Sequence, residues 1–189
     1  MTPFLKNMKF AYTLVAAIIL LGISMSVAHA SSAAEIDKDV DRALESLYAS
    51  SATAKNLATI SKGVLVFPHV IKAGLLVGGQ YGKGALRING QTVGYYNTVA
   101  ASYGLQAGAQ SFGYAMFLMA EEALDYLKKS DGWEVGVGPS VVVVDKGKAR
   151  SLTTSTAKED IYVFFFDQKG LMAGLGVQGS KISRITPDK

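Results

Sequence analysis

The sequence predicts an α+β fold: a mainly antiparallel sheet of barrel- or sandwich-like form, with an N-terminal helical segment and one internal helix. Apolar residues recur at helical spacing between residues 33 and 60 and over residues 120–129, whereas short apolar runs bounded by turn residues fill most of the remaining chain. The pair Asn89-Gly90 is a strong hairpin signal, and 20 glycines against 4 prolines favour strands and turns over a helical bundle.

The first thirty residues have the pattern of a secretory signal peptide. Lys6 and Lys9 precede an uncharged stretch over residues 11–23, and a small-x-small site follows at residues 28–30. We expect cleavage after residue 30 and export of a single domain, residues 31–189, to the periplasm if the source is a two-membrane bacterium. The alternative is an uncleaved membrane anchor, for which the apolar stretch is short and diluted by hydroxyl side chains.

Two helices are expected at the start of this domain. Ser32-Ala33-Ala34-Glu35 fits a capping box. A second short helix should hold Ala54, Leu57 and Ile60 and end at Gly63, where a left-handed cap suits glycine. The first helix presents one apolar stripe, formed by Ile36, Val40, Leu44 and Leu47.

The next segment predicts strands joined by a tight hairpin. A strand over residues 64–67 should stop at Pro68, and an apolar run continues over residues 70–77. A two-residue loop at Asn89-Gly90 would pair Ile88 with Gln91, Leu86 with Val93 and Gly84 with Tyr95. Provided that no glycine bulge shifts this register, it yields an apolar face of Leu86, Ile88, Val93 and Tyr95, and a basic-aromatic face of Lys83, Ala85, Arg87, Thr92 and Tyr96.

Further strands and one helix complete the predicted domain. Residues 120–129 form a helix with acidic residues early and lysines late, as the helix dipole prefers. Residues 141–144 and 161–166 are predicted to be buried strands, with turns at residues 145–147 and 167–170. A glycine-containing strand is expected over residues 171–177.

The residues offer no catalytic set. The chain has no cysteine, the glycine spacing over residues 78–83 is one residue short of a phosphate loop, and no nucleophile-elbow serine is present. After cleavage His69 is the only histidine, so no histidine pair can bind zinc. Glu121, Glu122 and Asp125 fit a solvated helix face. We therefore expect no enzyme activity, metal or cofactor, and a net charge of +4 does not by itself imply nucleic acid.

Clustered cations suggest a surface that binds anionic headgroups. Lys83 and Arg87 share one predicted strand face, Lys72 interrupts an apolar run, and Lys146, Lys148 and Arg150 alternate around a later turn. Such cations beside apolar or aromatic residues suit phosphate headgroups, each contributing about 1 kcal/mol at an anionic surface. The alternative is that these lysines only protect sheet edges from pairing with other chains.

Several ordered motifs resemble the SYLF domain family, also called the actin-patch lipid-binding domain family. The resemblance extends from about Ala43 to Ile185. Its motifs are GVLVFPHVIKAG at residues 63–74, GKG at 82–84, GLQAGAQ at 104–110, VGP at 137–139, KGLMAG at 169–174 and QGS at 178–180. The chain departs from many members after the hairpin, where GYYNT at residues 94–98 replaces a tryptophan-serine-x-proline element.

The resemblance implies a non-enzymatic phospholipid-binding domain and favours lipid contact over edge protection for the lysines. For a secreted bacterial member, the expected ligand is an anionic phosphoglycerolipid membrane. Nucleic acid and actin are not expected partners, and a protein partner of the envelope is the alternative. The expected lipid-binding residues are Lys72, Lys83, Arg87, Tyr81, Tyr96, Lys148 and Arg150.

Overall fold

The computed structural model describes residues 31–74, 77–103, 108–129, 132–145, 147, 149, 152–170 and 179–188. The expected signal peptide, the strand expected over residues 171–177, and the side chains of Lys146, Lys148 and Arg150 lie outside the described residues. All of the described residues belong to one unit, Ser31–Lys189.

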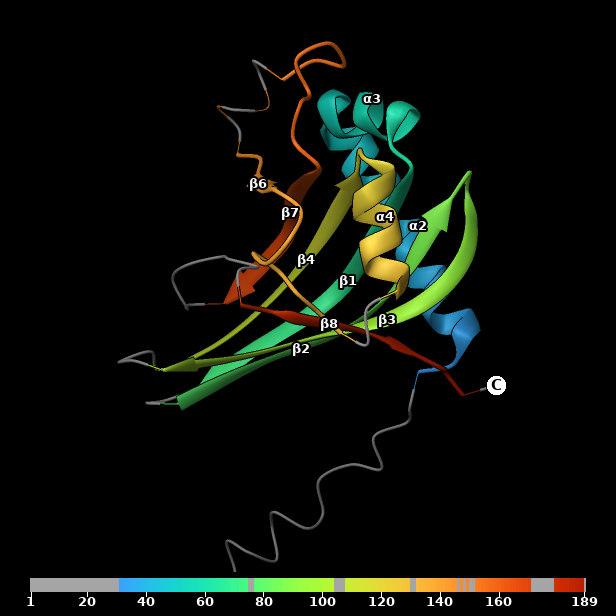
Figure 1. The fold of residues 1–189 in the computed structure, drawn as a ribbon. Coiled ribbons are helices and arrows are strands. Elements are labelled where there is room, and N and C mark those ends of the chain that lie inside the picture. The colour runs from blue at the N-terminus through green and yellow to red at the C-terminus, as the bar shows by residue number, and fades with distance from the viewer. Residues whose placement is uncertain are drawn as a thin grey trace, which may run out of the picture. The chain divides into compact units, whose positions relative to one another are not determined.

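The described residues form three helices and one curled, eight-stranded sheet, which confirms the predicted α+β class (Figure 1). Along the sheet the strands follow the order β5-β8-β3-β2-β1-β4-β7-β6, and all neighbouring pairs are antiparallel except β6 and β7. The elements are α2 (Ala33–Ser50), α3 (Ala52–Ile60), β1 (Gly63–Gly74), β2 (Val77–Ile88), β3 (Gln91–Tyr103), β4 (Gly108–Leu118), α4 (Glu121–Lys129), β5 (Trp133–Glu134), β6 (Val141–Val143), β7 (Ile161–Gly170) and β8 (Lys181–Ile185).

Helix α2 begins where the sequence predicts it. Ser32 caps α2 in a reciprocal capping box with Glu35, as expected. The end of α3 differs from the prediction, because Ser61 is its C-cap and donates its backbone N–H to the carbonyl of Leu57. Gly63 does not cap a helix; it pairs with Leu118 as the first residue of β1.

The strand predicted to stop at Pro68 continues to Gly74 as β1. The pairing of β1 with β2 shifts between Val66 and His69, and its pairing with β4 shifts between Phe67 and Val70. This β-bulge accommodates Pro68, whose missing N–H would otherwise break the ladder.

The hairpin loop is confirmed, and the predicted register holds for its first two residue pairs, Ile88 with Gln91 and Arg87 with Thr92, but fails beyond them. Asn89 and Gly90 have φ angles of 49° and 77°, and Ile88 pairs with Gln91. The register then shifts, so that Leu86 pairs with Gly94 instead of Val93. The pairings that follow are Ala85 with Tyr95 and Gly84 with Tyr96, which moves the two tyrosines to the faces opposite to those predicted.

The turn predicted at residues 167–170 is instead part of a strand, which has an irregular pairing there. β7 continues through residues 167–170, and its pairing with β4 shifts between Ser111 and Gly113. Asp167 has a φ of 51°, so this residue kinks the strand without ending it. The strand predicted over residues 141–144 is shorter and less buried than expected, because β6 is half-exposed and Val144 alone is buried.

The sheet has a hydrophobic core on each side, and these two cores define the two faces of the sheet. On one side, called here the α2 face, helices α2 and α3 pack on Val64, Val66 and Ala85. On the other, called the α4 face, α4 and Trp133 pack with Leu65, Phe67 and other side chains of alternating strand positions. Because successive strand residues point to opposite sides, the register assigns each strand residue to one of these faces.

Candidate functional site

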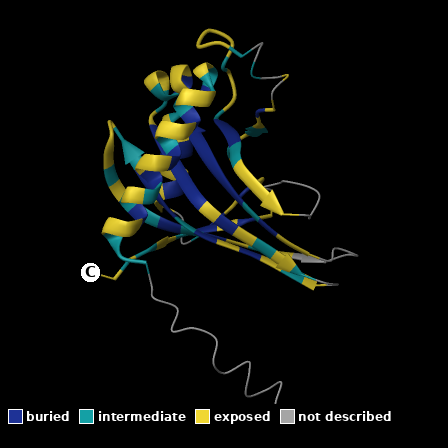
Figure 2. Cartoon of the chain, turned by 180° about the vertical axis from the view of Figure 1, so that it is seen from behind, coloured by how far each residue is buried: buried dark blue, intermediate teal, exposed yellow. Residues whose placement is uncertain are grey.

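At one end of the sheet the strands are largely exposed and no helix lies over them (Figure 2). On the α2 face this end carries exposed apolar side chains. Ile71, Tyr81 and Val99 are 61%, 48% and 45% exposed. Tyr81 is the direct cross-strand partner of both Ile71 and Val99, so the three form one continuous row across β1, β2 and β3. We call these three residues the exposed row. An exposed apolar cluster of this kind is typical of an interaction site.

Lysines stand at both ends of the exposed row. Lys181 of β8 pairs with Val99, and Lys169 of β7 pairs with Ser111, which in turn pairs with Ile71. Five strand spacings of about 4.8 Å separate the two lysine backbones, which makes about 24 Å measured along the curled sheet. The row therefore has a width comparable to several lipid headgroups.

A third lysine stands in the adjacent row on the same face. Lys83 is two residues from Tyr81 in β2 and pairs with His69 and Asn97. We call Lys83, Lys169 and Lys181 the flanking lysines. None of the three lies within 4.0 Å of a carboxylate among the described residues, although Glu134 pairs with Lys181 in the register.

Two of the predicted site residues, Tyr81 and Lys83, lie on this surface, whereas Lys72 and Tyr96 lie on the other side of the sheet. Tyr81 and Lys83 belong to the exposed row and its flank. Lys72 pairs with Gln80 and therefore lies on the α4 face, because β2 alternates regularly between the two sides. The structure thus separates Lys72 from Lys83.

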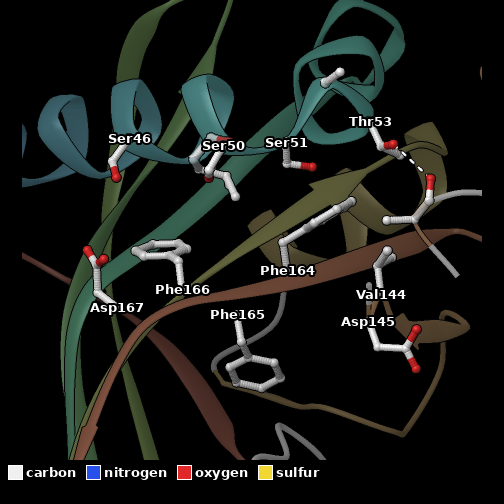
Figure 3. Close-up of a pocket in the computed structure, with 13 residues that line it drawn as sticks. Ser46, Ser50, Ser51, Thr53, Val144, Asp145, Phe164, Phe165, Phe166 and Asp167 are labelled. Carbon is white, nitrogen blue, oxygen red and sulfur yellow. Dashed lines mark hydrogen bonds between the residues drawn. The ribbon is translucent and has the colours of Figure 1, made fainter. Parts of the chain in front are cut away.

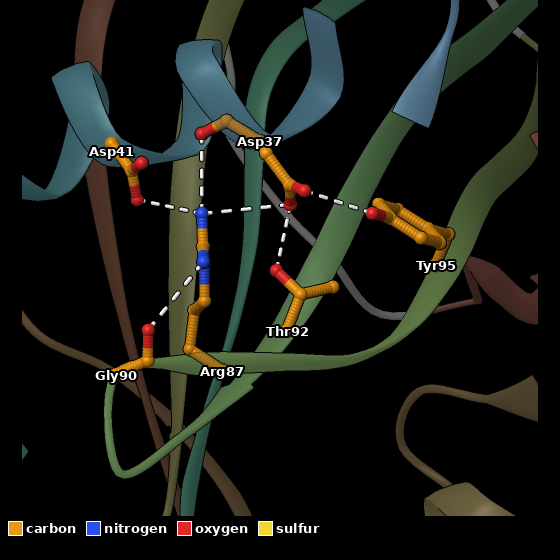
Figure 4. Close-up of polar contacts among 6 residues, drawn as sticks. All are labelled: Asp37, Asp41, Arg87, Gly90, Thr92 and Tyr95. Atoms are coloured by element: carbon orange, nitrogen blue, oxygen red, sulfur yellow. Dashed lines mark hydrogen bonds and ion pairs between the residues drawn. The ribbon is translucent and has the colours of Figure 1, made fainter. Parts of the chain in front are cut away.

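Arg87 is on the predicted face but is held by helix α2 (Figure 4). Its side chain is only 12% exposed. Its Nη2 donates to Asp41 Oδ1 at 2.6 Å and to the carbonyl of Asp37 at 3.2 Å, and it lies 3.5 Å from Asp37 Oδ1. Its Nη1 donates to the carbonyl of Gly90 at 3.5 Å. The guanidinium therefore ties α2 to the hairpin, and its geometry does not leave it free for a phosphate.

The Asp37 carboxylate also binds the second strand of the hairpin. Asp37 accepts hydrogen bonds from Thr92 Oγ1 at 2.6 Å and from the Tyr95 hydroxyl at 2.9 Å. Desolvation by burial, followed by the hydrogen bond to Asp37, raises the pKa of Tyr95. Asp37, Asp41, Arg87, Thr92 and Tyr95 thus form one structural network, which we call the Arg87 network.

Tyr96 does not lie on the surface at all. It is 2% exposed and packs in the core of the α4 face, the side opposite to that predicted. The cause is the register shift between Arg87 and Leu86, which places every β3 residue after Val93 on the side opposite to that predicted. Burial raises the pKa of its phenol, partly offset by Arg184. A side chain this buried cannot reach a membrane surface.

A pocket of about 680 Å³ lies between the α2–α3 junction and β7 (Figure 3). Ser46, Ser50, Phe164 and Phe166 line it, and Thr53 at its rim donates to the carbonyl of Ala149 at 2.8 Å. The charged side chains in its lining are two carboxylates, Asp145 and Asp167. Negative charge at the wall makes this pocket a poor site for an anionic headgroup.

Sequence reasoning missed four residues of the uncovered surface: Ile71, Val99, Lys169 and Lys181. Ile71 directly precedes Lys72 in an apolar run, so strand alternation alone could have separated the two residues onto opposite faces. The other three come together only through the pairing of β8 with β3 and of β7 with β4, which no local pattern reveals.

The described residues include no cluster of three or more side chains suited to a metal ion. Among the described helices, none combines the length and apolar character needed to cross a membrane.

Comparison with known proteins gives one family match. Residues 99–186 match the family model described as Ysc84, Las17-binding protein actin regulator. The matched segment begins at Val99 in the exposed row and extends through β4, α4 and β5–β8 to the end of the sheet. No curated protein matches the chain.

Proposed function

Because this chain belongs to the Ysc84 family, the SYLF domain family, we propose that it is a non-enzymatic protein that binds anionic phospholipid at a membrane surface. The observation that carries the proposal is the exposed row with its flanking lysines on the uncovered part of the α2 face. The proposed lipid-binding residues are Ile71, Tyr81, Lys83, Val99, Lys169 and Lys181.

The proposed mechanism divides the work between two kinds of side chain. Tyr81, Ile71 and Val99 would enter the interface between headgroups and acyl chains, where a tyrosine presents an apolar ring and a polar hydroxyl. Each lysine would hold a phosphate with about 1 kcal/mol. Three such lysines and a few partly buried apolar side chains give a moderate, reversible affinity, because neither contribution alone would anchor the protein.

The actin-regulating activity in the family description is not part of this proposal. We infer export from the signal-peptide pattern of residues 1–30, and an exported protein does not encounter actin. The relevant anionic lipids would then be those of the envelope, which are phosphoglycerolipids.

A protein-binding role is the second candidate, since an exposed apolar row also suits a protein partner. The placement of lysines at both ends of the row favours a lipid surface over an apolar protein patch. Crosslinking that recovers one partner, together with no vesicle binding, would support the protein-binding role.

Cosedimentation with vesicles tests the lipid proposal. Binding should rise with the fraction of phosphatidylglycerol in phosphatidylcholine vesicles and fall as salt is added, because salt screens exposed charges. The variant Lys83→Gln with Lys169→Gln removes about 2 kcal/mol and should lower the partition coefficient by about 30-fold, and Tyr81→Ser should lower it at all salt concentrations. The matched control is Lys128→Gln with Lys158→Gln, which removes two exposed lysines elsewhere. Equal binding of all variants, or equal binding to neutral vesicles at high salt, would contradict the proposal.

A further inference from the structure

A second polar row crosses the opposite side of the sheet. Lys72 of β1 is the direct cross-strand partner of Gln110 in β4 and of Gln80 in β2. Directly paired residues share a face, so the three side chains stand next to one another on the α4 face. We call these three residues the amide row. It is the neighbour of a core row that contains Phe112 and Val70.

The amide row is buried without being satisfied. Gln110 is 2% exposed, and both its Nε2 and Oε1 lack a hydrogen-bond partner. Gln80 is also buried, and its Nε2 has one long contact of 3.5 Å with Ser180 Oγ. A buried amide without partners costs roughly 1–3 kcal/mol, so such a group calls for a specific explanation.

In the sheet register Lys72 stands between these two glutamines. Its side chain is half-buried, and it makes no ion pair within the described part of the chain. The neighbouring core row of Phe112, Val70, Gly82 and Thr98 contains no carboxylate. A half-buried lysine thus lies beside the unpaired amide of Gln110, with no protein anion in either row.

The chemistry of these donors selects the ligand class. Lys72 offers three N–H donors and one positive charge, and each glutamine amide offers two further N–H donors. Charge-assisted hydrogen bonds from such a set are strongest to a carboxylate or phosphate oxygen. A cation would be repelled by Lys72, and an apolar group would leave the Gln110 amide unpaired.

We propose that the amide row binds an oxyanion, carboxylate or phosphate, with Lys72 Nζ and Gln110 Nε2 as the principal donors and Gln80 beside them. The oxyanion is either free in solution or part of a lipid headgroup. This site does not depend on the proposed function, because the exposed row and its flanking lysines lie on the other face of the sheet.

Side-chain amide NMR tests the proposal directly. The ¹⁵N-labelled protein is titrated separately with inorganic phosphate, acetate and dihexanoyl phosphatidic acid, with sodium chloride holding the ionic strength constant. We expect saturable shifts of the Gln110 and Gln80 side-chain NH₂ signals. Phosphate or acetate binding identifies a free oxyanion as sufficient, whereas shifts only with the phosphatidic acid identify a headgroup site.

Two variants on the row and one control make the test specific. Lys72→Met, which keeps the apolar stem, should weaken binding by about tenfold, the loss expected for one charge-assisted hydrogen bond. Gln110→Leu should weaken binding as well and stabilise the unliganded fold by removing the unpaired amide. Lys38→Met, at an exposed position of α2 that belongs neither to the amide row nor to the flanking lysines, should leave the affinity unchanged. Absence of saturable shifts with all three ligands, or an affinity unaffected by Lys72→Met and Gln110→Leu in folded protein, would overturn the proposal. Vesicle binding by the exposed row could still hold in that case.

Discussion

Arg87 Nη2 lies 2.6 Å from Asp41 Oδ1, although the two residues are 46 positions apart in the chain. The ion pair connects the first strand of the hairpin to the middle of α2, and Asp37 contributes a second carboxylate one helical turn earlier. A cation that the sequence offers for headgroup binding therefore serves to fix α2 on the sheet.

We predict that Arg87→Met destabilises the fold and leaves vesicle binding intact. The variant removes a guanidinium that is mostly buried and leaves the carboxylates of Asp37 and Asp41 without it, which should lower the free energy of unfolding by about 2 kcal/mol. Urea denaturation measures the stability and cosedimentation measures the binding. Arg42→Met is the control, because its pair with Asp39 is exposed and should contribute less than about 0.5 kcal/mol. A large loss of lipid binding in folded Arg87→Met protein would restore a headgroup role for this residue.

Lys83 and Arg87 share a face, but only Arg87 is held by an ion pair, and this difference shows how much of the site can be predicted from the sequence. Strand alternation in β2 correctly puts both residues on one face, and that local rule needs only the chain itself. Whether a cation on this face is free depends on what covers it. Helix α2 covers Arg87 and stops short of Tyr81, and this placement is a tertiary property.

Tyr96 shows a second limit of prediction from the sequence, which is the register of strand pairing. The hairpin loop follows from Asn89-Gly90, because both residues tolerate positive φ angles. The register shift lies between Arg87 and Leu86, where β3 has one extra residue, and it inverts the side of every later β3 side chain. Tyr95 then reaches Asp37 and Tyr96 enters the core, an outcome that the alternation pattern alone could not distinguish from its opposite.

The capping box at the start of α2 gives a second prediction. Ser32 Oγ accepts from the backbone N–H of Glu35 at 3.2 Å, and Glu35 Oε2 accepts from the backbone N–H of Ser32 at 3.0 Å. Ser32→Ala should lower the free energy of unfolding by about 1 kcal/mol, because a helix N-terminal donor loses its partner. Ser46→Ala, at an exposed position within the same helix, should be neutral or slightly stabilising, since alanine has the higher helix propensity. Urea midpoints that fall equally for both variants would contradict the capping role.

The third prediction concerns stability in alkaline solution. Tyr114 is fully buried with its hydroxyl 2.8 Å from Thr98 Oγ1, and desolvation raises the pKa of its phenol above the ordinary value of 10.0. The folded state therefore holds the phenolic proton more tightly than the unfolded state. This contribution to stability is complete below about pH 10 and decreases by roughly 1.4 kcal/mol per pH unit above it, as the unfolded tyrosine ionises.

Tyr114→Phe should therefore reduce the slope of unfolding free energy against pH above about pH 10. The slope is the readout, because the variant also loses the bond to Thr98 at every pH. Tyr81→Phe, at an exposed position, should retain the slope of the unsubstituted protein. Identical slopes for Tyr114→Phe and the unsubstituted protein would show that the buried phenol does not control alkaline unfolding.

The last prediction concerns the Gly82-Lys83-Gly84 segment, in which we assign strand packing to Gly84 and lipid contact to Lys83. A Cβ on Gly84 would lie 1.9 Å from the Val66 carbonyl oxygen and 2.9 Å from Phe67 Cδ1, so β2 can pass this close to β1 only with glycine there. Gly84→Ala should lower the free energy of unfolding by about 3 kcal/mol, because the obstructing atom belongs to the backbone and cannot rotate away.

Gly79→Ala is the matched control in the same strand, since the nearest atom to its Cβ is the Ala100 carbonyl oxygen at 3.9 Å. Its free energy of unfolding should be unchanged or up to about 1 kcal/mol higher, because alanine loses less backbone entropy on folding than glycine. If both variants lost the same stability, the close approach at Gly84 would not be the reason for its glycine. If Gly84→Ala alone is destabilised, glycine is needed at this position for packing. Lys83 is then the residue of the segment that contacts the ligand.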